Sequence, residues 1–227
     1  MDLSELIQRQ QELAKQVWIP QQETEGFQGE NPLIFSFDIQ YQGDIAYAAA
    51  DIQQYKGECI GTYVAKIEVT FPYLPQFFCF REAPILLDLL ARVQAHTQLR
   101  PDLLLIDGHG LAHPRKFGVA CYMGVESKLP AIGCAKETLV KYEGELDVER
   151  GSTLPNYVEN ELVGYVLRTQ TNIKPVFVSA GYGISLEKAK EIVLHLSPTY
   201  RISEPLRRAD HAARSFAKGE TGNWVEL

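Results

Sequence analysis

The stretch LLLIDGHGLAHPRKFGVACYMG, residues 103–124, decides the fold expected for this chain of 227 residues. Its first four residues form an apolar run that is typical of a strand buried inside a sheet. The run ends at Asp107, which is followed by Gly108 and Gly110. A carboxylate at the carboxyl end of a buried strand, with glycines after it, marks a place where another group approaches the backbone. An ordinary Asp-Gly turn is the alternative, but it leaves two histidines and an arginine within nine residues unexplained. A functional site is therefore the favoured interpretation.

The regions on either side of this stretch predict a mixed sheet with helices. Strands are expected over 33–37, ending on Asp38, and over 45–54 and 60–69, which together form an antiparallel meander. The alanines of 45–54 would also suit a helix. Later strands are expected over 131–135, 162–168 and 175–179, and residues 140–160 predict an excursion or a hairpin. Amphipathic spacing predicts helices near the N-terminus and over 81–96, 116–125, 186–196 and 204–217. Pro84 is expected in the first turn of its helix, and Ser185 as an N-cap.

Composition bounds the class of protein. With 45% hydrophobic and 22% charged residues, the chain is expected to fold as one α/β domain over 1–227, with an N-terminal helix and connection over 1–30. No apolar run approaches the roughly 18 residues of a membrane span, so no membrane partner is expected. The four cysteines lack Cys-x-x-Cys spacing, which argues against a zinc knuckle or a disulfide framework. A cytoplasmic monomer is the expectation. The net charge of −7 does not decide whether nucleic acid binds, because the position of the basic residues matters more.

Four acidic residues are candidates for a metal site. Asp38 and Asp107 each follow an apolar strand, whereas Glu82 and Asp210 lie on expected helices. Carboxylates at the ends of neighbouring strands repel one another unless a cation lies between them. Oxygen ligands favour Mg²⁺ or Mn²⁺, and such ions can activate water for phosphodiester hydrolysis. The alternative, four scattered surface acids, is weak for the two strand-end aspartates and stays open for Glu82 and Asp210.

Other polar and aromatic side chains allow two interpretations each. Lys136 follows the 131–135 strand and either neutralises phosphate or is a solvated surface lysine. His113 and Arg115 either contact phosphates or are loop residues. Tyr73, in a stiff Pro-rich loop, either inserts into a nucleic-acid stack or caps the core. His109 is expected to be structural, with a hydrogen bond inside its own turn.

Several segments resemble, in order, the motifs of the endonuclease V family of inosine-directed nucleases. They are FDIQYQGDIAYAAA (37–50), FPYLPQFFCFRE (71–82), DGHGLAHPR (107–115), PAIGCAK (130–136) and YRISEPLRRAD (200–210). The resemblance implies an α/β, ribonuclease H-like fold with a central mixed β-sheet flanked by helices. It also implies Mg²⁺-dependent hydrolysis, with Mn²⁺ as a substitute, of a phosphodiester one nucleotide 3′ of a deaminated base, inosine, in DNA or RNA. Nucleic-acid repair is the process expected.

The same resemblance assigns roles to individual residues. Asp38, Glu82, Asp107 and Asp210 would bind metal, and Lys136 would lie near the scissile phosphate. Tyr73 matches a wedge that fills the space left by an extruded base. The remaining residues expected to bind the base or the strand are Gln76, Phe78, Gly108, Gly110, His113 and Leu139. Gln76 stands where many relatives have glycine, and Cys121-Tyr122 replaces a usual Ser-His.

Two other functions compete with this one. A related ribonuclease H-like nuclease would recognise a junction rather than a base. A non-catalytic binder of damaged nucleic acid is the other alternative, and the complete set of acidic residues argues against it.

Overall fold

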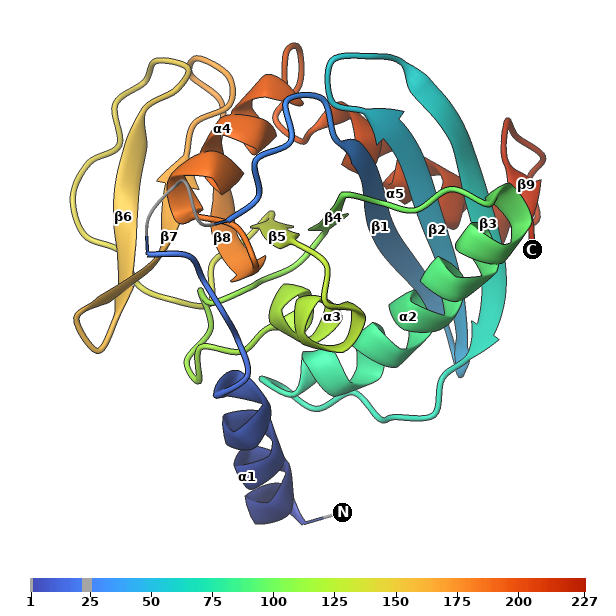
Figure 1. Cartoon of the computed structure of the whole chain (residues 1–227), viewed down its shortest axis with the longest axis horizontal. Helices are drawn as coiled ribbons and strands as arrows, with labels where there is room; N and C mark the ends of the chain where they lie inside the picture. Colours follow the sequence, from blue (N-terminus) through green and yellow to red (C-terminus); the bar gives the residue numbers. More distant parts are fainter. Residues whose placement is uncertain (1, 22–25) are drawn as a thin grey trace.

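The apolar run at residue 103 forms β4 (Leu103–Ile106), in which every side chain is buried. The computed structural model describes residues 2–21 and 26–227, so residues 22–25 of the expected connection lie outside it. Within the described residues, nine strands form one sheet in the order β6-β7-β8-β5-β4-β1-β2-β3-β9, with β4 at its centre (Figure 1). The site that follows β4 therefore lies in the middle of the sheet rather than at one side.

The first half of the sheet confirms the expected meander. β1 (Leu33–Gln42), β2 (Ile45–Gln54) and β3 (Cys59–Glu68) pair antiparallel in sequence order. β4 pairs parallel with β1 and with β5 (Ala131–Ala135), so the sheet is mixed. The alanine-rich segment 45–54 is a strand, because its alanines are buried against helices on both faces of the sheet.

The second half of the sheet is antiparallel. β6 (Thr153–Val158) and β7 (Glu161–Leu167) form a hairpin, and β8 (Val176–Tyr182) lies between β7 and β5. Glu159 and Asn160 join the hairpin with φ of 50° and 66°, as in the two-residue turns that match strand twist. Residues 140–160 thus include one strand of a hairpin. A short strand that the sequence does not predict, β9 (Val225–Glu226), pairs with β3.

Helices cover both faces of the sheet (Figure 1). α2 (Phe78–Thr97) and α3 (Val119–Ser127) pack on the face that carries Phe35 and Phe37. α4 (Leu186–His195) packs on the opposite face, against Ile34, and α5 (Glu204–Ala217) covers β1, β2 and β3 there. Ser185 caps α4 as expected. α1 (Leu3–Ala14) stands out from the body and contacts α3. Among the described residues, no helix is long and apolar enough to cross a membrane.

Three of the boundaries that differ from those expected lie close to the site. β1 does not end on Asp38 but continues to Gln42, since β2 pairs with it along its whole length. α2 begins at Phe78, because burial of Cys79 and Phe80 in the core extends the helix, and Pro84 therefore lies beyond its first turn. α3 begins at Val119 instead of residue 116, since Lys116 has a φ of 50°.

Candidate metal centre and the adjoining cavity

The pairing of β1 with β4 brings Asp38 and Asp107 together. Phe37 is the partner of Ile106, and the Asp107 N–H donates to the Phe37 carbonyl at 3.1 Å. β4 ends at Ile106 while β1 continues, so no residue of β4 pairs with Asp38. Both carboxyl side chains are only 14% exposed. The sequence expectation that these two acids share one edge is thus confirmed, although Asp38 lies inside its strand.

Lys136 brings a positive charge to the two aspartates. It follows β5, which is parallel to β4, so its side chain emerges at the same edge of the sheet. Its Nζ donates to Asp107 Oδ2, and lies 3.9 Å from Asp38 Oδ2 and 3.7 Å from Asp210 Oδ1. Lys136 is therefore not an isolated surface lysine, because three carboxylates from separate elements surround its ammonium group.

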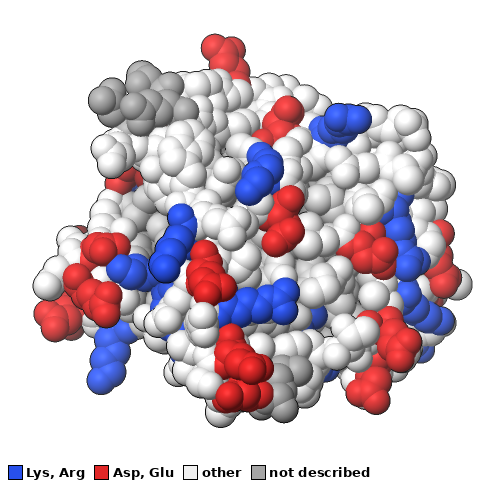
Figure 2. Space-filling view, turned by 60° about the horizontal axis from the view of Figure 1, so that its bottom comes forward, with Lys and Arg blue, Asp and Glu red and all other residues white. Residues whose placement is uncertain are grey.

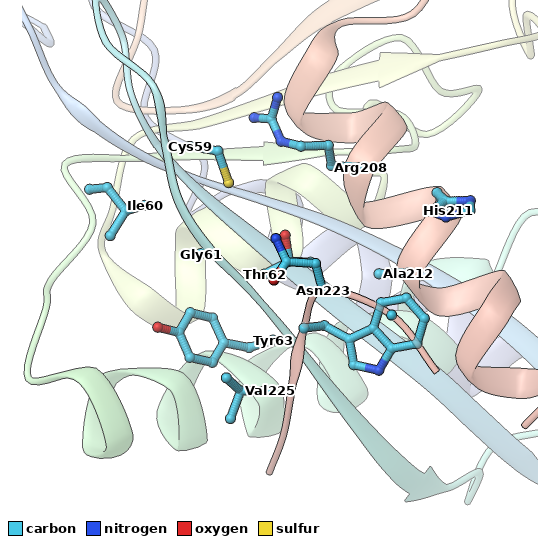
Figure 3. A pocket seen from close by; sticks show the side chains of 12 residues that line it. Cys59, Ile60, Gly61, Thr62, Tyr63, Arg208, His211, Ala212, Asn223 and Val225 are labelled. Carbon is cyan, nitrogen blue, oxygen red and sulfur yellow. The ribbon is translucent and has the colours of Figure 1, made fainter. Parts of the chain in front are cut away.

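Asp210 reaches this group from α5. Arg214, one turn later, donates to both of its carboxylate oxygens at 2.7 and 2.6 Å. Burial acts to raise the pKa of Asp210, but Arg214 and Lys136 lower it, so this carboxylate is held in its charged form. The neighbouring His211 lies elsewhere, on a cavity of about 540 Å³ between α5, β3 and the C-terminal segment (Figure 3). The helix thus presents the aspartate, not the histidine, to the site.

Glu82 completes the acidic group from α2. Its side chain is buried, and burial followed by the charges of Asp38 and Asp107 raises its pKa well above the usual value. Burial and the Asp107 charge likewise raise the pKa of Asp38, against the opposing effect of Lys136. Such mutual repulsion is relieved by a cation. All four acids named from the sequence therefore belong to one electrostatic cluster.

The cluster suits a hard cation by donor type. Over residues 2–21 and 26–227, no three acidic, histidine or cysteine side chains enclose a ready-made metal site. The Lys136 ammonium is instead the cation around which the carboxylates converge. Oxygen donors and an excess of negative charge fit Mg²⁺ or Mn²⁺.

A cavity of about 340 Å³, here called the site cavity, adjoins the carboxylates, with Glu82, Asp107 and Lys136 in its wall. Six of the seven residues expected to contact a base or strand also line it: Tyr73, Gln76, Phe78, Gly108, His113 and Leu139. Gly110 does not line it. A Cβ at Gly110 would lie 2.2 Å from the Ala180 carbonyl oxygen, so this glycine permits close packing of the turn against β8.

Tyr73 and Phe78 form the aromatic part of the wall. Tyr73 is 65% exposed and makes an edge-on contact with Phe78, at a centroid distance of 5.6 Å. This exposure excludes the interpretation of Tyr73 as a cap on the core. The loop that carries it, here called the 69–77 loop, presents the ring to solvent beside the cavity.

His113 is buried, and the half-exposed Arg115 is engaged with the protein, so neither side chain is free to contact a phosphate in this conformation. His113 is buried; its Nε2 lies 3.1 Å from the Gln76 carbonyl oxygen, and its Nδ1 accepts from the Arg115 N–H at 3.1 Å. Arg115 stacks over the Phe77 ring and donates to both the carbonyl and the side-chain oxygen of Gln76. The two residues thus hold the 69–77 loop in place.

Gln76 has a φ of 67°, a conformation that favours glycine. A glycine would adopt this backbone conformation without strain, which fits the glycine expected here from the family motif. Because its side-chain oxygen accepts from Arg115 at 2.9 Å, the amide is engaged with the protein at the wall of the cavity.

Sequence reasoning missed several residues of the cavity wall. They include Cys79, His109, Val119 and Glu137. His109 was expected to bond within its own turn, but its buried Nδ1 has no hydrogen-bond partner among the described residues. Burial lowers its pKa to about 4. The Gly-His-Gly spacing was the only sequence signal available for it.

A central mixed sheet with helices on both faces, and with acidic residues gathered beside its middle strands, is typical of the ribonuclease H-like class. A family model described as Endonuclease V matches residues 11–211. A protein named Endonuclease V from Geotalea uraniireducens is 40% identical over 220 residues, 96% of this chain and 89% of its own. One from Roseiflexus castenholzii is 43% identical over 177 residues, 78% of each chain. The chain therefore belongs to the endonuclease V family.

Solved structures share the fold. The crystal structure of Endonuclease V from Streptomyces avermitilis superposes with a TM-score of 0.84 at 35% identity, covering 96% of this chain and 94% of that one. The catalytic domain of human Endonuclease V gives 0.86 at 27% identity, with 96% of both chains covered. Endonuclease V from Ciona intestinalis, crystallised with a 23mer DNA containing an inosine followed by a ribo-adenosine, gives 0.83 at 24% identity, with coverage of 96% and 97%.

Proposed function

We propose that this protein is a Mg²⁺-dependent endonuclease that cuts DNA or RNA one nucleotide 3′ of an inosine, as a step in nucleic-acid repair. Membership of the endonuclease V family supports the reaction class. The single observation that carries the proposal is the position of the carboxylate cluster in the wall of a cavity flanked by an exposed aromatic ring.

The metal would be held by Asp38, Glu82, Asp107 and Asp210. When bound, Mg²⁺ or Mn²⁺ supplies activation of a water molecule and charge stabilisation at the leaving oxygen. Lys136 lies among these carboxylates and would move its ammonium group toward the negatively charged phosphate. Arg214 keeps Asp210 ionised, so that helix α5 presents a charged oxygen to the site.

The site cavity would receive the extruded base. Phe78, Leu139 and the backbone at Gly108 offer an apolar wall and close backbone approach. Extrusion costs a few kcal/mol of stacking and pairing. Tyr73, which is exposed at the cavity, would offset part of this cost by stacking in the gap.

Charge on the surface is mixed rather than uniformly basic. On the face shown in Figure 2, Lys and Arg side chains alternate with Asp and Glu. Because phosphate contacts depend on local basic groups and not on net charge, this pattern does not argue against a nucleic-acid partner.

Incubation with Mg²⁺ and end-labelled strands tests the proposal. Matched strands would carry one inosine, no inosine, or a junction. We expect a nick at a fixed offset 3′ of the inosine, abolished by Asp38→Asn or Asp107→Asn with binding retained, and unchanged by Asp88→Asn, which removes a surface carboxylate paired with Arg92 on α2. Cutting only at the junction would support a structure-directed nuclease, and retention without cutting a non-catalytic binder. Either result would overturn the proposal.

A further inference from the structure

Gln10, on α1, is a buried polar residue far in sequence from the site. Leu6 and Gln10 are the two buried residues of α1, all of whose residues are described, and Gln10 is 0% exposed. A buried amide is costly unless its donors and acceptor are paired. The polar partners of Gln10 therefore indicate what this helix contributes.

All of those partners lie next to the site cavity. Gln10 Nε2 donates to the Phe117 carbonyl at 2.8 Å, and more weakly to the Gln76 carbonyl at 3.3 Å. Its Oε1 accepts from Arg115 Nε. One side chain thus joins the N-terminal helix to the 69–77 loop and to the loop that precedes α3.

Arg115 carries the connection on to Gln76. Its Nη2 donates to the Gln76 carbonyl at 2.8 Å and its Nη1 to the Gln76 side chain at 2.9 Å, while its guanidinium carbon lies 4.4 Å from the centre of the Phe77 ring. Gln10 accepts from Nε, the third nitrogen of this guanidinium. Because Gln76 has a φ of 67°, which is unfavourable for a side chain, the loop needs such contacts to keep its shape.

We propose that Gln10 is a positioning residue, which holds Arg115 against Gln76 and so fixes the 69–77 loop with Tyr73 beside the site cavity. Through Gln10, α1 holds in place the 69–77 loop, which would insert Tyr73 into the substrate. This inference rests on the proposed function, and deepens it by assigning substrate positioning to a helix that lies outside the catalytic cluster.

Gln10→Met removes the hydrogen bonds and keeps the volume. The matched control is Gln11→Met, at an exposed position of the same helix. We expect faster hydrogen exchange in residues 69–77 of Gln10→Met without substrate, and about tenfold weaker binding of an inosine strand in Ca²⁺. Gln10→Glu keeps an acceptor for Arg115 but loses the donor to the Phe117 carbonyl, so it should restore part of the affinity. Gln11→Met should match the wild type in both measurements.

A double-mutant comparison distinguishes positioning from general destabilisation. If Gln10 acts through the 69–77 loop, Gln10→Met should weaken binding little further once Tyr73→Ala is present, since coupled residues are not additive. An equal loss in both backgrounds would overturn the proposal, as would unchanged exchange in residues 69–77. If wild type itself shows no preference for the inosine strand, the proposed function fails. The hydrogen-exchange measurement still tests whether Gln10 holds the 69–77 loop.

Discussion

Single residues at the site have roles that depend on what surrounds them. Tyr73 and His113 are both aromatic and both line the site cavity. Tyr73 is mostly exposed and free to stack on another ring, whereas His113 is buried with both ring nitrogens engaged. Substitution of the first should therefore change binding, and protonation of the second should change stability.

Tyr73→Ala should weaken binding of an inosine-containing strand by roughly tenfold or more, because base–aromatic stacking is worth about 1–3 kcal/mol. Tyr73→Phe should bind as wild type does, since the ring and not the hydroxyl would stack. Fluorescence anisotropy with Ca²⁺ in place of Mg²⁺ measures both affinities. Equal affinity for wild type and Tyr73→Ala would remove the wedge assignment.

Acidification should destabilise the fold through His113. Burial and then the Arg115 charge lower its pKa to about 4, from an ordinary value of 6.5. The neutral ring is favoured in the folded state, so its contribution is complete above pH 6.5 and is lost as the pH falls toward 4. Between pH 7 and pH 5 the loss should be about 2 kcal/mol.

Urea unfolding at both pH values checks this sign. His113→Gln removes the titration while keeping a donor and an acceptor, so its stability should fall less between pH 7 and pH 5 than that of wild type. The exposed His96→Gln serves as the control and should follow the wild type. A steeper fall for His113→Gln would contradict the argument.

At the scale of elements, α5 is fixed to the sheet by an ion pair whose aspartate is buried. Asp51 on β2 is 0% exposed; Arg208 donates to its two oxygens at 2.7 and 2.8 Å, and Thr62 adds a hydroxyl at 3.1 Å. Arg208 lies two residues before Asp210 on the same helix and lines the cavity shown in Figure 3. The pair thereby fixes the helix that delivers Asp210.

Arg208→Met should destabilise the protein by about 3–5 kcal/mol, because it leaves the Asp51 carboxylate buried and unpaired. Adding Asp51→Asn should recover part of the loss. Arg207→Met, at the preceding and exposed position, should cost about 1 kcal/mol or less. Chemical denaturation measures all of these, and similar losses for the two arginine variants would contradict the assignment.

At the scale of the whole molecule, the carboxylate cluster joins elements that are distant in sequence. β1, α2, the end of β4 and α5 each supply one acid. A cation bound among them would therefore stabilise the complete fold, since its ligands come together only when the sheet and both helix layers have formed.

Mg²⁺ or Mn²⁺ at about 100 times its Kd should stabilise the protein by about 2.7 kcal/mol. For a chain of this size the Tm should rise by roughly 5–10 °C. Asp107→Asn should reduce this rise, and Asp88→Asn, at a surface ion pair on α2, should not. Differential scanning calorimetry provides a measurement independent of cleavage. An equal rise in wild type and Asp107→Asn would place the ion elsewhere.

The sequence by itself determined the order of the elements and the acids at the site. Apolar runs and helical spacing are local patterns, so strands such as β4 and helices such as α5 could be located from them. Asp107 stood out because a carboxylate follows a buried run. The family motifs added the proposed metal-binding roles of Glu82 and Asp210, for which the pattern alone left the surface interpretation open.

Only the tertiary structure decided which distant groups meet. The Asp51–Arg208 pair joins residues 157 positions apart, and Gln10 contacts Arg115 across 105 positions. No local period encodes such contacts, which arise when burial forces polar groups to find partners. The role of Gly110 is likewise not encoded locally, because its lack of a side chain permits packing against Ala180, 70 positions later in the chain, and does not shape the cavity.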